Sequence, residues 1–209
     1  MIETLDQLRA LYPAATERAR RKQMAGLDPH AQRFIALSPF CVLASSGGAG
    51  QLLDASPRGG PPGFVKCRDA QTLLLPDVSG NNRLDTLENL LQDPRLSLLF
   101  LVPGVDETLR VNGHARLRDE AEVCALFAGE RRLPQLVIEI TVQEAYLHCP
   151  KAFMRSALWQ APAPDQAPRQ GLPTLGQMIH DQIGLDTPPE TQAEMLARYQ
   201  AQLRQEQAD

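Results

Sequence analysis

The sequence predicts a mainly β protein with flanking helices, built as a mostly antiparallel barrel or sandwich. A series of short strand-like segments fills the middle of the chain, and few long helices separate them, which argues against alternating β–α–β units. One segment, 108–118, alternates apolar and polar residues, as expected for a strand with one buried face. Another segment, 96–102, is continuously apolar and is expected to be buried on both faces.

The strand segments are short and are bounded by turn signals. The first of them ends in Ser-Gly-Gly-Ala-Gly, a glycine turn that is typical of a hairpin with the segment that follows. The expected strands are Phe40–Ser45, Gln51–Ala55, Phe64–Cys67, Thr72–Pro76, Leu96–Val102, Thr108–Arg118, Leu136–Val142 and Ala145–His148.

Helical signals lie on both sides of the strand-rich part. Thr4 and Gln7 match a capping box at the start of an amphipathic segment. Pro13 and Pro29 interrupt this segment, so we expect two or three short helices. A Pro/Gln/Ala-rich linker follows the strands and precedes a terminal helix. The expected segments are 1–37, which is helical, 38–160, the strand-rich domain, and 161–209, the linker with the C-terminal helices.

Composition argues against several classes of function. The 209 residues have a net charge of −4, without the basic stripe typical of nucleic-acid binders. The longest apolar run, 96–102, is far shorter than the ~20 residues needed to cross a bilayer. The cysteines and histidines show no metal-ligand spacing, so we predict reduced thiols and no metal site. We therefore expect a cytoplasmic protein that binds neither nucleic acid nor membranes.

A Gly-Asn-Asn-Arg corner precedes a short amphipathic helix that is expected to end before Pro94. Asn81 or Asn82 would cap this helix, and Arg83 would lie in its first turn, where a cation opposes the helix dipole. An anion at the helix N-terminus would resolve that conflict, because the guanidinium and the backbone N–H groups would both bind it. The alternative is that Arg83 pairs with a nearby carboxylate, Asp77 or Asp85.

Ser56, Pro57 and Arg58 begin a second corner, in which glycines and prolines fix an irregular backbone. Ser56 supplies a hydroxyl donor, and Arg58 supplies a guanidinium suited to bidentate recognition of phosphate. The alternative is a rigid turn with Arg58 in solvent. No P-loop or Rossmann glycine pattern occurs here or elsewhere in the chain.

A third group of polar and aromatic residues follows the last expected strand. Lys151, Arg155 and Trp159 are spaced four residues apart, so on a helix they would share one face. Two cations and an aromatic plane on one face would suit the border of an anionic ring system. The alternative is a plain surface helix with Trp159 packed against the barrel.

Taken together and in this order, these motifs resemble the pyridoxamine 5′-phosphate oxidase-related flavoproteins. The resemblance covers about residues 34–159 and rests on the runs DASPRGGPPGFVK, LLLPDVSGNNRLDTLENLLQDPRLSLLFLVPG, ETLRVNGHARL and EAYLHCPKAFMRSALW. It implies a split antiparallel β-barrel, a homodimer, and FMN bound at the subunit interface by residues of both chains.

The resemblance also implies a set of cofactor-binding residues. Those at the phosphate and ribityl end are Ser56, Arg58, Asn82 and Arg83, and the set also includes Pro57 from the matching strand and Asn81 from the matching corner. Those near the flavin ring are Thr108 and Arg110, and those that would border the ring across the dimer are Lys151, Arg155, Ser156 and Trp159.

The function implied by the resemblance is that of an FMN-dependent oxidoreductase whose substrate and electron donor the sequence does not name. True pyridoxamine phosphate oxidases carry a C-terminal motif of the type Arg-Leu-His-Asp-Arg. This chain has instead the Pro-rich linker and a helix around Met195, so we do not expect it to oxidise pyridoxamine phosphate. The alternative is a non-catalytic flavin- or haem-binding module, or a sensor, that acts through a partner.

Overall fold

The computed structural model describes residues 1–78, 82–129, 133–160, 171–184 and 186–208. The chain divides into two compact units, and each is described here by itself. The first consists of Met1–Glu120 and Gln135–Trp159, and the second of Ala121–Pro134 and Gln160–Asp209. The three segments predicted from the sequence stay a prediction.

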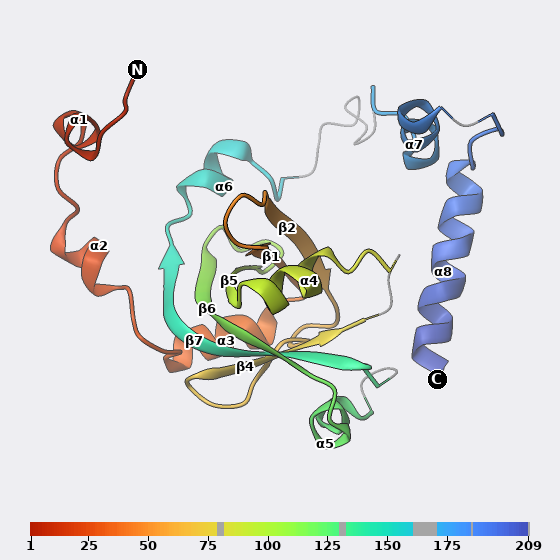
Figure 1. Cartoon of the computed structure of the whole chain (residues 1–209), viewed down its shortest axis with the longest axis horizontal. Helices are drawn as coiled ribbons and strands as arrows, with labels where there is room; N and C mark the ends of the chain where they lie inside the picture. Colours follow the sequence, from red (N-terminus) through yellow and green to blue (C-terminus); the bar gives the residue numbers. More distant parts are fainter. Residues whose placement is uncertain (79–81, 130–132, 161–170, 185, 209) are drawn as a thin grey trace. The chain divides into compact units, whose positions relative to one another are not determined.

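A seven-stranded antiparallel sheet forms the first unit, in the order β2-β1-β5-β6-β7-β4-β3 (Figure 1). The sheet with its flanking helices confirms the predicted fold class. Its strands are β1 (Phe40–Ser46), β2 (Leu53–Gly59), β3 (Lys66–Cys67), β4 (Thr72–Asp77), β5 (Arg95–Leu101), β6 (Thr108–Arg118) and β7 (Leu136–His148).

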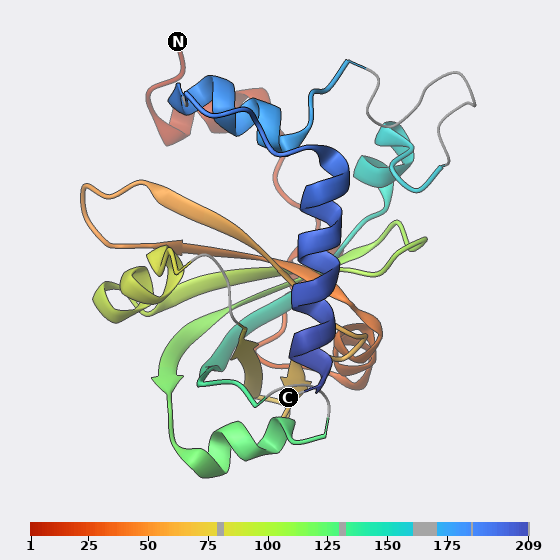
Figure 2. The same ribbon diagram turned by 90° about the vertical axis from the view of Figure 1, so that its right-hand side faces the viewer.

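The sheet curls into a split barrel, so that strands far apart in the strand order approach each other. β2 is the first strand in the order and β4 the sixth, yet Nη1 of Arg58 on β2 lies 3.1 Å from Oδ1 of Asp77 on β4. This side-chain pair bridges the seam of the barrel. α4 (Asp85–Gln92) packs against β1, β2 and β6, whereas α3 (Pro29–Leu37) packs against β3, β6 and β7. Figure 2 shows these two helices at opposite ends of the curled sheet.

Apolar side chains on the inward face of the sheet fill the barrel. Leu43, Leu98 and Val111 are neighbours across β1, β5 and β6, and each is completely buried. Ile35 from α3 and Leu90 from α4 join the same core from the two helices. Burial of this apolar surface is the main source of the unit's stability.

β7 is one strand where the sequence predicts two. Its register against β6 passes over Gln143, which is therefore the extra residue of a β-bulge. Because one extra residue reverses the alternation of faces, Val142 and Ala145 both point into the core, with 2% and 0% of their surface exposed. The predicted break between 142 and 145 is wrong. The change of phase in the sequence marks a bulge within a strand.

β5 is not buried on both faces, which corrects the prediction for 96–102. Leu96, Leu98 and Phe100 are buried, whereas the residues between them are half-exposed. β5 lies in the wall of a barrel, so only its inward face meets the core. The continuous apolar run is explained by outward side chains such as Leu99, which lies opposite Arg110 of β6.

Three short helices form the N-terminal part, as predicted: α1 (Leu5–Leu11), α2 (Glu17–Arg21) and α3. Thr4 and Gln7 make the expected capping box at α1. The segment after α2 runs beside the end of β7, where β4 no longer pairs with it. There Met24 and Ala145 exchange backbone hydrogen bonds of 3.0 and 2.8 Å. This pairing brings Lys22 to the end of β7.

Helices make up the regular structure described in the second unit. They are α5 (Ala121–Cys124) with the short 3-10 turn Ala125–Phe127, α7 (Leu175–Ile183) and α8 (Gln192–Ala208). α7 begins at Thr174, whose hydroxyl accepts from the backbone of Gln177, and α8 confirms the helix predicted around Met195. Most of the predicted linker lies outside the described residues. Within the described ranges, no helix has the length and apolar character to cross a bilayer.

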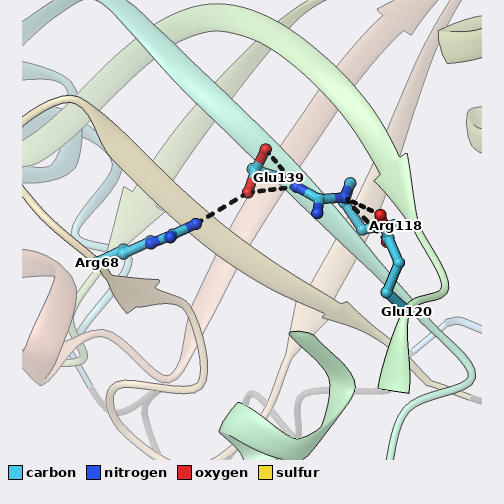
Figure 3. Close-up of polar contacts among 4 residues, drawn as sticks. All are labelled: Arg68, Arg118, Glu120 and Glu139. Atoms are coloured by element: carbon cyan, nitrogen blue, oxygen red, sulfur yellow. Dashed lines mark hydrogen bonds and ion pairs between the residues drawn. The ribbon is translucent and has the colours of Figure 1, made fainter. Parts of the chain in front are cut away.

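An ion-pair network joins β6 and β7 to the chain after β3 (Figure 3). Nη1 of Arg118 lies 2.9 Å from both carboxylate oxygens of Glu139, and Arg68 reaches the same carboxylate at 3.3 Å. Arg118 also donates to Glu120 at 2.9 Å. Only 13% of the Glu139 side chain is exposed, so Glu139 is the centre of the network.

Replacing Glu139 with glutamine is expected to lower the free energy of unfolding by about 1–2 kcal/mol, because two guanidiniums lose a part-buried anionic acceptor. Urea unfolding of the variant measures this change. Glu120→Gln serves as the control, since Glu120 is more exposed and pairs with one guanidinium of the network, that of Arg118, so its effect should be smaller. Equal effects of the two substitutions would contradict a central role for Glu139.

Candidate functional site

Three polar side chains meet where β2 faces the first turn of α4. The hydroxyls of Ser56 and Thr86 donate to Oδ2 of Asp54 at 2.9 and 2.8 Å, and the two hydroxyl oxygens are 3.1 Å apart. Thr86 is the second residue of α4 and is buried. The Asp54 carboxylate therefore lies beside the N-terminus of α4, where the helix dipole favours an anion.

Arg58 lies two residues beyond Ser56 on the same side of β2. Its Nη1 donates to Asp77, but its Nε is buried and has no hydrogen-bond partner among the described residues. A buried donor without an acceptor is unfavourable by about 1–3 kcal/mol. An oxygen of a bound ligand would supply the missing acceptor, so this nitrogen points to an incomplete site.

Arg83 precedes α4 and does not lie in its first turn, which corrects the prediction. The helix begins at Asp85, and its N-cap is Leu84, which makes no side-chain cap, so the predicted asparagine cap is wrong. Asn82 has a φ of 60°, a left-handed conformation that delays the start of the helix and that asparagine tolerates. Arg83 donates to Oδ2 of Asp85 at 2.7 and 3.0 Å, which raises the pKa of Arg83. Asn81 lies outside the described residues.

These residues form one cluster, called here the α4 corner and defined as Asp54, Ser56, Arg58, Arg83 and Thr86. Its two guanidiniums already meet carboxylates, so a bound phosphate has to compete with them. The Arg83–Asp85 pair is 75% and 45% exposed and is easily broken, whereas the Arg58–Asp77 pair is mostly buried. The residues fit a phosphate through two cations, the start of α4 and a buried N–H that is unpaired among the described residues, whereas the hydroxyls of Ser56 and Thr86 would have to turn from Asp54 to donate to it.

The predicted site residues lie on two opposite faces of the sheet. In the register of β2, β1, β5 and β6, Ser56 belongs to the same row as Val111, on the core face. Pro57 belongs to the same row as Arg110, on the outer face, and Arg58 returns to the core face. One chain therefore does not bring Arg58 and Arg110 to the same side of its sheet.

A second cluster lies on the outer face, called here the outer-face cluster and defined as Lys22, Arg110, Tyr146 and His148. The guanidinium carbon of Arg110 is 4.5 Å from the ring centroid of Tyr146, and Nζ of Lys22 is 5.2 Å from the same centroid. The rings of Tyr146 and His148 have centroids 4.9 Å apart. Partial burial and the charges of Arg110 and Lys22 lower the pKa of His148. Thr108 lies opposite His148 and is buried.

The residues after β7 do not share one helical face as predicted. α6 (Lys151–Ser156) ends at Ala157, whose φ of 49° is left-handed, so Trp159 lies beyond the helix. Trp159 stacks on Phe153 with ring centroids 5.4 Å apart, and its Nε1 donates to the backbone oxygen of Val105 at 3.0 Å. Trp159 is therefore packed onto its own domain. Arg155 and Ser156 donate to backbone oxygens of α6 itself.

All four cysteines are free thiols, as predicted. Burial raises the pKa of Cys41 to about 12, against the opposing charge of Arg58, and that of Cys67 to about 11. Both thiols are thus protonated at neutral pH. Among the residues that the structure describes, no group of three or more His, Cys, Asp or Glu side chains is arranged to hold a metal ion.

The curled antiparallel sheet with its flanking helices defines the class of split-barrel domains. The family model described as pyridoxamine 5′-phosphate oxidase matches residues 27–149. This match spans more than half of the chain, and the protein belongs to that family, whose members typically bind FMN.

The solved structures that are similar to this chain have low sequence identity to it. A HupZ variant from Group A Streptococcus has 14% identity and a TM-score of 0.49, over 58% of this chain and 99% of that one. An FMN-binding protein from Syntrophomonas wolfei has 11% identity and a TM-score of 0.46, over 57% and 84%. A NimC/NimA family protein from Clostridium acetobutylicum has 16% identity and a TM-score of 0.42, over 58% and 87%. No curated protein matches the sequence.

Proposed function

We propose that this protein binds FMN and acts as an FMN-dependent oxidoreductase. The observation that carries the proposal is the buried Nε of Arg58, which has no partner among the described residues and lies in the α4 corner of a chain from this family. An Arg nitrogen, hydroxyls and a helix N-terminus are the groups that proteins use for phosphate. The FMN phosphate would complete the corner and satisfy the unpaired nitrogen.

Residues on the two faces of the sheet would bind different parts of FMN. Ser56, Arg58, Asn82 and Arg83 would bind the phosphate and ribityl end. Thr108 and Arg110 of the outer face would lie near the ring, and residues that follow β7 would border it, namely Lys151, Arg155, Ser156 and Trp159. Because Arg58 and Arg110 face opposite sides of one sheet, the proposal includes a homodimer in which each flavin contacts both chains.

Bound FMN would supply hydride and electron transfer, while the protein supplies position and electrostatics. Arg110 would place a fixed positive charge near the ring and so favour negative charge on it. The hydrogen-bonded trio of Asp54, Ser56 and Thr86 would orient the hydroxyls at the phosphate end. The C-terminal part is helix α8 and lacks the Arg-Leu-His-Asp-Arg type motif, so pyridoxamine phosphate is not the proposed substrate.

The expected result for the purified protein is a yellow colour with an absorption band near ~450 nm, retained or restored after incubation with FMN. The band should co-elute with a dimer in size-exclusion chromatography with light scattering. A colourless protein that takes up no FMN would refute the proposal. Bound FMN that no nicotinamide donor reduces in stopped-flow measurements would favour the non-catalytic carrier over the oxidoreductase.

A further inference from the structure

Two polar atoms on the outer face of β6 are buried and have no hydrogen-bond partner in the part of the chain that the structure describes. They are Nε of Arg110 and Oδ1 of Asn112, which lie on the same side of the strand. Nδ2 of Asn112 donates to Glu144, and Gln23 donates to the other oxygen of that carboxylate. Both oxygens of the Glu144 carboxylate therefore accept from amides, which leave its negative charge in place. In the described part of the chain, Arg110 forms no ion pair.

Among the described residues, neither Lys22 nor Arg110 forms a salt bridge with a carboxylate, although Glu144 lies on the same face, opposite Asn112. Lys22 donates to the backbone oxygen of Leu147 at 2.8 Å, which fixes its position but leaves its charge. Arg110 stacks on Tyr146, and a cation–π contact also holds a guanidinium without cancelling its charge. Two cations thus stay close together around one aromatic ring, which is unfavourable unless an anion joins them.

The side chains of the outer-face cluster come from segments that are far apart in the sequence. The pairing of Met24 with Ala145 holds Lys22 at the end of β7. The bulge at Gln143 turns Tyr146 outward, so that it lies opposite Arg110 in the register. His148 follows on the same face, two residues beyond Tyr146.

We propose that the outer-face cluster binds one anionic oxygen group, a carboxylate or a phosphate, of a small molecule. Arg110 supplies a charge and the unpaired Nε–H, Lys22 supplies a second charge, and His148 supplies a ring nitrogen. That this molecule is the substrate of the flavin reaction rests on the proposed function, and the substrate class is then small carboxylates or phosphate esters. The FMN phosphate itself is the other source of the same chemistry, and the experiment separates the two.

The test titrates inorganic phosphate and, separately, benzoate into FMN-free and FMN-saturated protein, with the His148 ring followed by NMR. His148 is assigned from the spectrum of His148→Gln. Binding should raise the pKa of His148, because a nearby anion favours the charged imidazolium. Arg110→Gln should weaken anion binding about tenfold or more, as loss of a charged donor does. Lys22→Gln, at an exposed site, should weaken it less.

Arg116→Gln is the matched control, since Arg116 is an exposed arginine of the same strand, and its anion affinity should equal that of the unchanged protein. Equal affinities in the Arg110, Lys22 and Arg116 variants, or no binding of either probe, would overturn the proposal. Anion binding that disappears when FMN saturates the protein would also overturn it, because the cluster would then belong to the flavin. The FMN-free arm stands even if the protein binds no FMN.

Discussion

Replacing Arg58 with glutamine is expected to weaken FMN binding about 10- to 100-fold, the scale of one or two charged hydrogen bonds. The side chain of Arg58 is only 18% exposed, and its Nε has no acceptor within the described ranges. This nitrogen has already lost its water on folding. A hydrogen bond from it to a phosphate oxygen therefore carries no further desolvation penalty for the donor. Fluorescence titration of FMN into the FMN-free variant measures the loss.

Two further variants separate the charge of Arg58 from its shape. Arg58→Lys keeps the positive charge but removes the planar guanidinium with its paired N–H donors. An intermediate loss of FMN affinity would show that the geometry of the donors contributes. Arg83→Gln should lower FMN affinity less than Arg58→Gln, because 75% of the Arg83 side chain is exposed and water screens its charge. Urea midpoints of all variants control for the stability that Arg58 contributes through Asp77.

Asp54 provides a test with the opposite sign. Its carboxylate lies beside the start of α4 and repels a phosphate, although it also orients the hydroxyls of Ser56 and Thr86. Asp54→Asn keeps the shape of the side chain and an acceptor oxygen but removes the charge, so FMN affinity should rise. Affinities that stay the same in both Asp54→Asn and Arg58→Gln would place the phosphate elsewhere.

The sequence predicts the fold well because the signals for the strands are local. Alternation in 108–118 and the glycine turn after the first strand determine strands and a hairpin without reference to the rest of the chain. The predicted helix caps fare differently. Thr4 and Gln7 act within one turn and are confirmed, whereas Asn82 adopts a left-handed conformation and the helix begins only at Asp85.

The site is only partly predictable, because its two clusters depend on pairings between distant segments. Sequence motifs single out Arg58 and Arg110, but only the register shows that they lie on opposite faces. Lys22 belongs to the outer-face cluster because the segment after α2 pairs with β7, and no sequence motif predicts this pairing. Tyr146 carries a weak signal in the sequence, since the apolar alternation of β7 changes phase just before it.

Replacing Gly113 with alanine is expected to lower the free energy of unfolding by about 2–3 kcal/mol, at the upper end of what overpacking usually does. Gly113 lies on β6 opposite the bulge of β7. A Cβ there would fall on the backbone oxygen of Thr141 and come within 2.9 Å of Cγ2 of Ile140. Neither group can move away easily, because the Thr141 oxygen belongs to the backbone and the Ile140 side chain is completely buried.

Gly59→Ala is the matched control, a glycine-to-alanine change in strand β2. Its added Cβ would meet its nearest atom, the backbone oxygen of Pro39, at 3.5 Å, which is an ordinary contact. The free energy of unfolding should then change by less than about 0.5 kcal/mol, or rise slightly because the unfolded chain loses freedom. Urea unfolding of both variants at one temperature gives the comparison.

The Gly113 variant also tests how the outer-face cluster is built. If β7 moves away to accommodate the methyl group, Tyr146 and His148 shift relative to Arg110, and anion affinity should fall even though none of these residues has changed. A Gly113→Ala protein that is as stable as the parent and binds phosphate equally well would contradict this. The bulge would then be free to relax, and the position of Tyr146 would have to depend on the N-terminal segment that pairs with Ala145.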